Sequence, residues 1–183
     1  MTTYSINLDE IRQRAHDRAN DFDIMLHTLE FREELSDEAL DALVERVAQP
    51  IIHAIDCTQC ANCCRSLHVY LTPEDSTTLA NFVGLDEIAF DDQYINHDEA
   101  HVVGEWGRFA DRPCRFLQGS LCGVYSHRPE TCRTYPMLTP DFRWMLTDLI
   151  EGTSVCPIIF HTLDAMERLL DQLDHHLDLP LVN

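Results

Sequence analysis

The feature that most constrains this chain is a run of four cysteines within eight residues, Cys57-x2-Cys60-x2-Cys63-Cys64. A C-x2-C spacing lets one tight turn direct two thiolates at a single ion, so it is common in zinc and iron–sulfur sites. Four further cysteines follow in the second half of the chain. The pattern predicts a metal held by all eight: Cys57, Cys60, Cys63, Cys64, Cys114, Cys122, Cys132 and Cys156.

The adjacent pair Cys63 and Cys64 indicates how these thiols divide. Neighbouring side chains diverge in a helix and in a strand alike, so we expect the two to have different destinations. Eight thiols then form two four-ligand sites, or one cluster with two or three thiols in excess. We favour two closely spaced sites. Zinc is the first-choice metal, and iron, as thiolate-bound iron or an iron–sulfur cluster, is the alternative.

Three roles for the cysteines that involve no metal account for less of the pattern. Residues 1–30 show no apolar signal segment, so we expect a cytoplasmic protein whose thiols stay reduced rather than a disulfide framework. A thioredoxin-like pair at Cys57 and Cys60 would need a surrounding βαβ unit, which the sequence does not suggest. Burial as an inert small hydrophobe suits Cys156 best, but it does not explain four cysteines in eight residues.

Charge excludes some partners. The chain has 13 basic and 32 acidic residues, a net charge of −19, which repels nucleic acid and anionic membrane surfaces. No apolar stretch approaches the ~20 residues of a membrane span. Residues 71–106 contain nine acids and no base, and this acidic surface is a candidate dock for a basic protein partner.

The basic residues gather where three of the cysteines lie. Residues 107–145 hold six arginines and three acids, and the same segment contains Cys114, Cys122 and Cys132. Positive charge favours the thiolate form that binds metal. It would also offset the net charge of about −2 on a zinc ion with four cysteinates.

Periodicity predicts helices at both ends of the chain. Apolar spacing indicates one helix over residues 5–33 and a second that begins after Ser36 and is kinked or broken at Pro50. A strand is expected over 66–71, a helix from Thr72 to Gly84, loop over 85–113 and a hairpin around 119–120. A helical turn is expected near 128–132. The C-terminal helix has an apolar stripe at Ile159, Leu163, Met166, Leu170, Leu173 and Leu177.

Histidines and carboxylates offer alternative ligands. His68 and His127 lie close to cysteines in sequence and could each complete a site. Acidic residues at 91–92 and 98–99 could bind a hard cation, but no EF-hand spacing is present. Their more ordinary interpretation is a solvated surface.

The motifs resemble a known family. Besides the cysteine run, these are Pro113-Cys114-Arg115-Phe116-Leu117, Cys122-Gly123-Val124-Tyr125, and the stretch Arg128-Pro129-Glu130-Thr131-Cys132-Arg133-Thr134-Tyr135-Pro136. Together they look like the YkgJ-type cysteine cluster family, a zinc- or iron-chelating domain. The resemblance covers Cys57 to Cys156. It implies a metal held by cysteines and leaves the reaction, if any, open.

We therefore predict an α+β fold, a small mixed domain with helices at both ends and a cysteine-rich, loop-dominated metal-binding centre. The expected divisions are an N-terminal helical segment (1–56), a cysteine-cluster metal-binding domain (57–157) and a C-terminal helix packed on the same domain (158–183). The predicted function is metal binding. An iron–sulfur or thiolate-iron oxidoreductase or modifying enzyme is the alternative.

Overall fold

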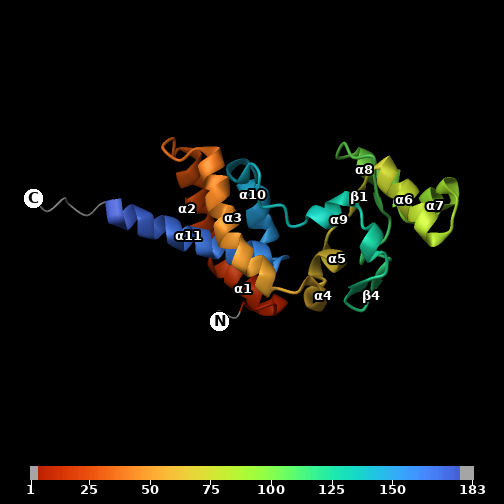
Figure 1. Cartoon of the computed structure of the whole chain (residues 1–183), viewed down its shortest axis with the longest axis horizontal. Coiled ribbons are helices and arrows are strands. Elements are labelled where there is room, and N and C mark those ends of the chain that lie inside the picture. The colour runs from red at the N-terminus through yellow and green to blue at the C-terminus, as the bar shows by residue number, and fades with distance from the viewer. Residues whose placement is uncertain (1–3, 178–183) are drawn as a thin grey trace, which may run out of the picture. The chain divides into compact units, whose positions relative to one another are not determined.

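The structure is a computed structural model that describes residues 4–177, and side chains as far as residue 173. The chain divides into two compact units (Figure 1). Residues 1–56 and 136–183 form the helical unit, and residues 57–135 form the cysteine unit. The α+β fold class predicted from the sequence is confirmed, since helices predominate and the strands are short and antiparallel.

The helical unit contains α1 (Leu8–Asp17), α2 (Ala19–Glu30), α3 (Asp37–Ala54), α10 (Phe142–Gly152) and α11 (Pro157–Leu177). The prediction of one helix over 5–33 is wrong, because the chain turns at Arg18 between α1 and α2. This turn allows both helices to pack against α11. Ser36 caps α3 as predicted, its hydroxyl accepting a hydrogen bond from the Ala39 amide (3.3 Å).

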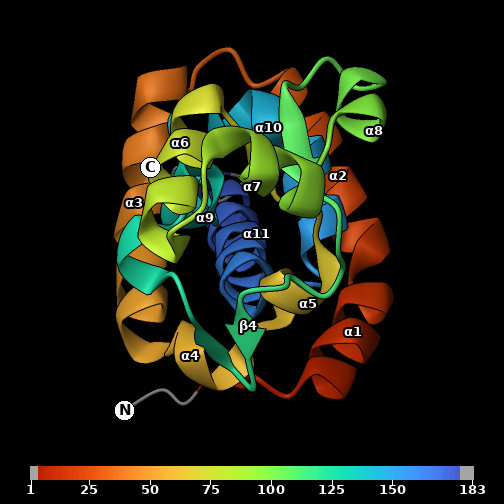
Figure 2. The same ribbon diagram turned by 90° about the vertical axis from the view of Figure 1, so that its right-hand side faces the viewer.

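Helix α11 is the centre of the helical unit. Figure 2 shows it running between α3 on one side and α1 and α2 on the other. The rings of Phe160 and Phe22 meet edge to face, 6.3 Å between centroids. The predicted apolar stripe is buried at Ile159, Leu163, Met166 and Leu170, whereas Leu173 is 44% exposed. The side chain of Leu177 lies outside the described residues.

Two features of the helical unit differ from expectation. A kink or a break was expected at Pro50, and helix α3 continues through Pro50 to Ala54 without a break. Helix α10 was not predicted, and its N-terminus is capped by a residue that is distant in sequence. Asp141 begins the helix in the left-handed region (φ 68°) without a side-chain cap of its own. The carboxylate of Asp41 on α3 instead accepts from the Asp141 and Phe142 amides, each at 2.9 Å.

The cysteine unit is built from short elements. In chain order they are α4 (Cys57–Cys60), α5 (Asn62–Ser66), β1 (Tyr70–Leu71), α6 (Pro73–Val83), α7 (Glu87–Tyr94), β2 (Ile95–Asn96), α8 (His97–His101), β3 (Gly107–Phe109), β4 (Leu117–Gln118), β5 (Leu121–Cys122), the 3-10 turn η1 (Tyr125–His127) and α9 (Glu130–Thr134). The strands β1, β3 and β2 form an antiparallel sheet in that order. Strands β4 and β5 form the predicted hairpin.

Helix α6 confirms the strongest local prediction, and its surroundings correct two others. Thr72 and Asp75 form a reciprocal capping box, and Gly84 ends the helix at φ 77°. The predicted loop over 85–113 instead contains α7 and α8, because Asp86 and Asn96 each cap a helix. The predicted strand over 66–71 is only two residues long, since Ser66 still belongs to α5.

A small apolar core joins these elements. Its buried members are Leu71, Leu79, Ala80, Phe90, Ile95, Phe109 and Val124. Gly107 allows β3 to lie close to β2, because a Cβ there would come within 2.7 Å of the Ile95 side chain. Cys114 and Cys122 pack against the rim of this core. In the part of the chain that the structure describes, no helix has the length and apolar character needed to cross a bilayer.

Candidate metal centre

The first four cysteines lie on two short helices. Cys57 and Cys60 are the first and last residues of α4, and Cys63 and Cys64 lie in α5. Ala61 adopts a left-handed conformation (φ 50°) and turns the chain between the two helices. Cys57 is exposed and the other three are partly buried. All eight cysteines of the chain are present as thiols.

Arg65 ties this run to the β4–β5 hairpin. Its guanidinium donates to the carbonyl of Cys60 (2.6 Å) and to the carbonyl of Gly119 (2.8 Å). Figure 1 shows α4, α5 and the hairpin on one side of the unit, with α6 and α7 on the other. Arg65 therefore brings the segment of Cys60 next to the segment that carries Cys122.

Backbone hydrogen bonds bring Cys64, Cys114 and Cys122 together. The amide of Cys114 donates to the carbonyl of Cys64 (2.8 Å). The carbonyl of Cys114 accepts from Leu117 (3.0 Å), and Leu117 is the strand partner of Cys122. Cys64, Cys114 and Cys122 are thus linked through main-chain hydrogen bonds.

Cys132 is brought in by helix α9. The Glu130 amide at the start of α9 donates to the Asp75 carboxylate (3.1 Å), and the Thr131 hydroxyl donates to the Tyr70 carbonyl (2.9 Å). Asp75 is buried, and its second oxygen completes the Thr72 capping box. The Asp75 carboxylate therefore caps the N-terminus of α6 and also binds α9, the helix that carries Cys132.

Electrostatic effects on their pKa values couple four of the thiols. Burial raises the pKa of Cys132 to about 12, and negative charge on Cys114, Cys64 and Cys122 raises it further, against a smaller lowering by Arg128. Burial also raises the pKa of Cys114, and charge on Cys64 and Cys122 adds to the increase. We refer to Cys64, Cys114, Cys122 and Cys132 as the four-thiol group.

Within the four-thiol group, the pKa of Cys64 is lowered, whereas the pKa values of Cys114 and Cys132 are raised. Cys64 is therefore ionised more readily than Cys114 and Cys132. A hydrogen bond with the Cys63 thiol, whose sulfur lies 3.9 Å away, lowers the pKa of Cys64 to about 6. Burial opposes this lowering, and the charges of Arg65 and Arg128 add to it. At neutral pH the four-thiol group therefore contains a thiolate at Cys64 and protonated thiols at Cys114 and Cys132.

Arg128 is held firmly beside these thiols. Its Nε donates to the Tyr125 carbonyl (3.0 Å), and its guanidinium lies 3.7 Å from the centre of the Tyr125 ring. Its own carbonyl accepts from the guanidinium of Arg133. The basic residues of the RPxxCR stretch thus stabilise one another's positions next to Cys132.

The donor set suits a thiophilic metal, although coordination geometry is not present. Among the described residues, no three cysteine, histidine, aspartate or glutamate side chains lie close enough together to hold an ion as placed. The chemistry of the four-thiol group nevertheless fits zinc or iron, both of which take four cysteine ligands. Metal binding would require Cys114 and Cys132 to lose their protons.

Cys156 differs from the other seven. It belongs to the helical unit and is 7% exposed. Its backbone joins α10 to α11, donating to the Gly152 carbonyl (2.9 Å) and accepting from the Phe160 amide (3.0 Å). Its assignment as a ligand stays a prediction.

The alternative ligands have other partners. The ring of His127 stacks on Phe82, with centroids 4.3 Å apart. Both ring nitrogens of His68 face arginines. In the acidic segment, Asp91 accepts from Ser76 (2.7 Å) and lies 3.3 Å from His97. These contacts favour structural roles for His127 and Asp91.

Two residues that organise the centre were missed from the sequence. Arg65 was not singled out, and Asp75 was assigned only to the start of a helix. The signal for Arg65 is its place directly after the cysteine run. Nothing in the sequence pattern indicates that Asp75 also binds the Glu130 amide, because that contact spans 55 positions.

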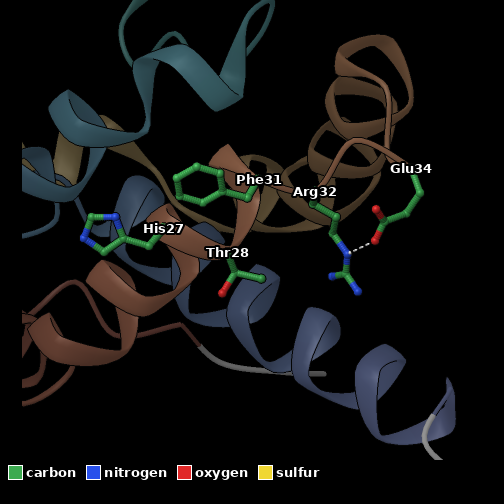
Figure 3. A pocket seen from close by; sticks show the side chains of 5 residues that line it. All are labelled: His27, Thr28, Phe31, Arg32 and Glu34. Carbon is green, nitrogen blue, oxygen red and sulfur yellow. Dashed lines mark hydrogen bonds and ion pairs between the residues drawn. The ribbon is translucent and has the colours of Figure 1, made fainter.

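The helical unit also contains a hollow of about 510 Å³ with no thiol in it. Figure 3 shows its lining of His27, Thr28, Phe31, Arg32 and Glu34, with Arg32 donating to Glu34 (3.0 Å). Phe31 is 80% exposed, so the hollow is open to solvent. It offers no enclosed site for a small ligand.

A unit of short helices and strands that gathers cysteines from separate segments around basic residues defines the class of protein as a cysteine-rich domain. The model of the family described as "CxxCxxCC: Putative zinc- or iron-chelating domain" matches residues 56–156. The chain belongs to this family, and the resemblance noted from its cysteines is confirmed. Comparisons with curated proteins and with solved structures give no match.

Proposed function

We propose that this protein binds one metal ion through the four-thiol group, Cys64, Cys114, Cys122 and Cys132, with zinc as the first-choice metal. A second, adjacent ion would be bound by the three other thiols of the cysteine unit, Cys57, Cys60 and Cys63. The observation that carries the proposal is the main-chain linkage of Cys64, Cys114 and Cys122, with α9 docking Cys132 beside them.

Charge supports this choice of ligands. A divalent ion with four thiolates carries a net charge of about −2, which a protein of net charge −19 would tolerate poorly without local cations. Arg65 and Arg128 both lower the pKa of Cys64 by their charge, so they act on the centre. Because both guanidiniums are fixed by hydrogen bonds to carbonyls, they remain in place to offset the bound thiolates.

An iron–sulfur or thiolate-iron oxidoreductase or modifying enzyme is the second candidate. It is favoured by the exposure of Cys57, since a solvent-accessible cluster edge suits electron transfer or reaction with a substrate. A closed zinc site with four protein ligands leaves no open position for direct catalysis. The two candidates therefore differ in both metal and function.

The test compares two matched substitutions, Cys132→Ala in the cysteine unit and Cys156→Ala in the helical unit. Full-length protein is purified anaerobically without a metal-affinity tag, and its metal content and visible spectrum are measured. The wild type is expected to be colourless, with one or two zinc ions per chain. Cys132→Ala should lose about one ion, because three ligands remain at its site, whereas Cys156→Ala should keep the full content.

The other outcomes identify the alternatives. Brown protein containing iron, with absorption that bleaches on reduction, would replace the zinc proposal with the iron one. Equal loss of metal in both variants would mean that Cys156 completes a site. Full metal content in Cys132→Ala would rule out the four-thiol group as the centre.

A further inference from the structure

A second polar cluster of the cysteine unit involves none of the proposed metal ligands. It consists of His68, two residues before the start of strand β1, Arg108 on β3, and Arg112. Strand pairing brings these segments together, with Arg108 opposite Tyr70 and the Phe109 amide donating to the Val69 carbonyl (3.0 Å). His68 and Arg112 are exposed, while Arg108 is 7% exposed.

Both nitrogens of the His68 ring face guanidinium groups. Arg108 contacts Nδ1, and Nη1 of Arg112 lies 3.2 Å from Nε2. A guanidinium has five donors and no acceptor, and a neutral imidazole has one donor and one acceptor. In one of the two contacts, therefore, the N–H of the His68 ring faces an N–H of a guanidinium group. Burial and the charges of both arginines lower the pKa of His68, so its ring is neutral at pH 7.

The charges of the cluster do not cancel. Arg108 forms an ion pair with Glu99. No carboxylate of the described residues pairs with Arg112, and the nearby Asp111 is bound to Arg115 (3.3 Å). Nε of Arg108 is buried and has no hydrogen-bond partner among the described residues. The cluster thus has a net positive charge and donors in excess of acceptors, within a strongly acidic protein.

We propose that His68, Arg108 and Arg112 form an anion-binding site for the oxygen anion of a carboxylate or phosphate group. Such an anion only accepts hydrogen bonds, so it can take one from the His68 N–H and two from the planar Arg112 fork. The opposed N–H groups then both gain a partner. Arg108 donates to the remaining ring nitrogen and sets the tautomer of His68. This site does not require a metal at the cysteines.

The site is tested on full-length protein as purified, with ¹⁵N-labelled histidine. Inorganic phosphate and acetate are titrated separately, with sodium chloride holding the ionic strength constant, and the His68 ring signals, assigned with a His68→Gln variant, are followed by NMR. The variant is Arg112→Gln. The matched control is Arg115→Gln, which changes the charge equally three residues away but removes a guanidinium already paired with Asp111.

Saturable shifts of His68 are expected in the wild type and in Arg115→Gln. Binding to Arg112→Gln should be at least about tenfold weaker, because a charged bidentate contact is lost. Saturation by phosphate alone or acetate alone would support the site and assign its ligand. Equal responses in all three proteins would indicate a nonspecific effect of the anions and overturn the site, as would no saturable shift in the wild type. Melting temperatures of the variants show that each is folded.

Discussion

At the scale of single residues, neighbouring cysteines acquire different chemistry. Cys63 and Cys64 are adjacent in sequence, yet Cys64 joins the four-thiol group and is stabilised as a thiolate by its neighbour. Their adjacency predicted side chains that diverge, but the two sulfurs lie 3.9 Å apart, in contact. The lowered pKa of Cys64 was not predicted either, because it depends on this contact and on the charges of Arg65 and Arg128.

Metal-free protein should therefore react selectively at Cys64. With a pKa of about 6, Cys64 is roughly nine-tenths thiolate at pH 7, whereas an ordinary thiol is a few per cent ionised. Its rate of alkylation by iodoacetamide should rise with pH through a midpoint near 6 and then level off. Peptide mass spectrometry of samples quenched at different times measures this rate at each pH.

The Cys63→Ala variant is the control, because it removes the hydrogen bond that chiefly lowers the pKa of Cys64. The midpoint of the alkylation profile should move upward toward an ordinary thiol value. An identical profile in both proteins would show that Cys63 does not stabilise the thiolate.

The residue scale also shows what sequence could predict about the site. Spacing predicts cysteine as the residue type that binds metal, since C-x2-C is a local pattern, and this stays a prediction. It could not predict that Cys64, Cys114, Cys122 and Cys132 form one group. That grouping depends on contacts over long stretches of chain, such as the Cys114 amide with the Cys64 carbonyl.

At the scale of elements, helices were predictable where their own residues cap them. The helix after Thr72 carries its capping box within four residues, and its limits were expected correctly. Helices α7 and α8 were assigned to a loop because acidic residues dominate the segment, although Asp86 and Asn96 are ordinary N-caps. Helix α10 could not be delimited in this way, since its cap, Asp41, is 100 positions away.

Asp41→Ala should destabilise the protein by about 1–2 kcal/mol, because two amide donors at the N-terminus of α10 lose their acceptor. Glu45→Ala, one turn further along α3, is the control. Among the described residues, Glu45 accepts only from the Thr139 hydroxyl at the surface (3.2 Å), so its loss should cost less than about 0.5 kcal/mol. Urea denaturation of the two variants measures the difference, and equal effects would contradict the capping role.

At the scale of the whole molecule, two units depend on different sources of stability. The helical unit has a core of large buried side chains, including Phe22, Phe142 and Phe160. The cysteine unit has a smaller core and many short elements. We therefore expect bound metal to contribute to the stability of the cysteine unit, since metal-binding free energy is also folding free energy.

Removing the metal with a chelator should accelerate hydrogen exchange in residues 57–135 and leave exchange in α11 nearly unchanged. Mass spectrometry of peptides from the two units measures the effect in one experiment, and re-addition of zinc should restore protection. Acceleration spread evenly over both units would show that the metal stabilises the whole chain as one cooperative body.

The order of the segments along the chain has a kinetic consequence. The cysteine unit is inserted between α3 and α10, so the helical unit is assembled from residues on both sides of it. The contact of α11 with α3 must close over the whole insertion, and the entropy of loop closure opposes this step. If the insertion has already folded around its metal, the length of flexible chain that must close between α3 and α11 is shorter. Metal supplied early in folding should therefore speed the association of α3 with α11, although neither helix carries any of the seven cysteines of the insertion.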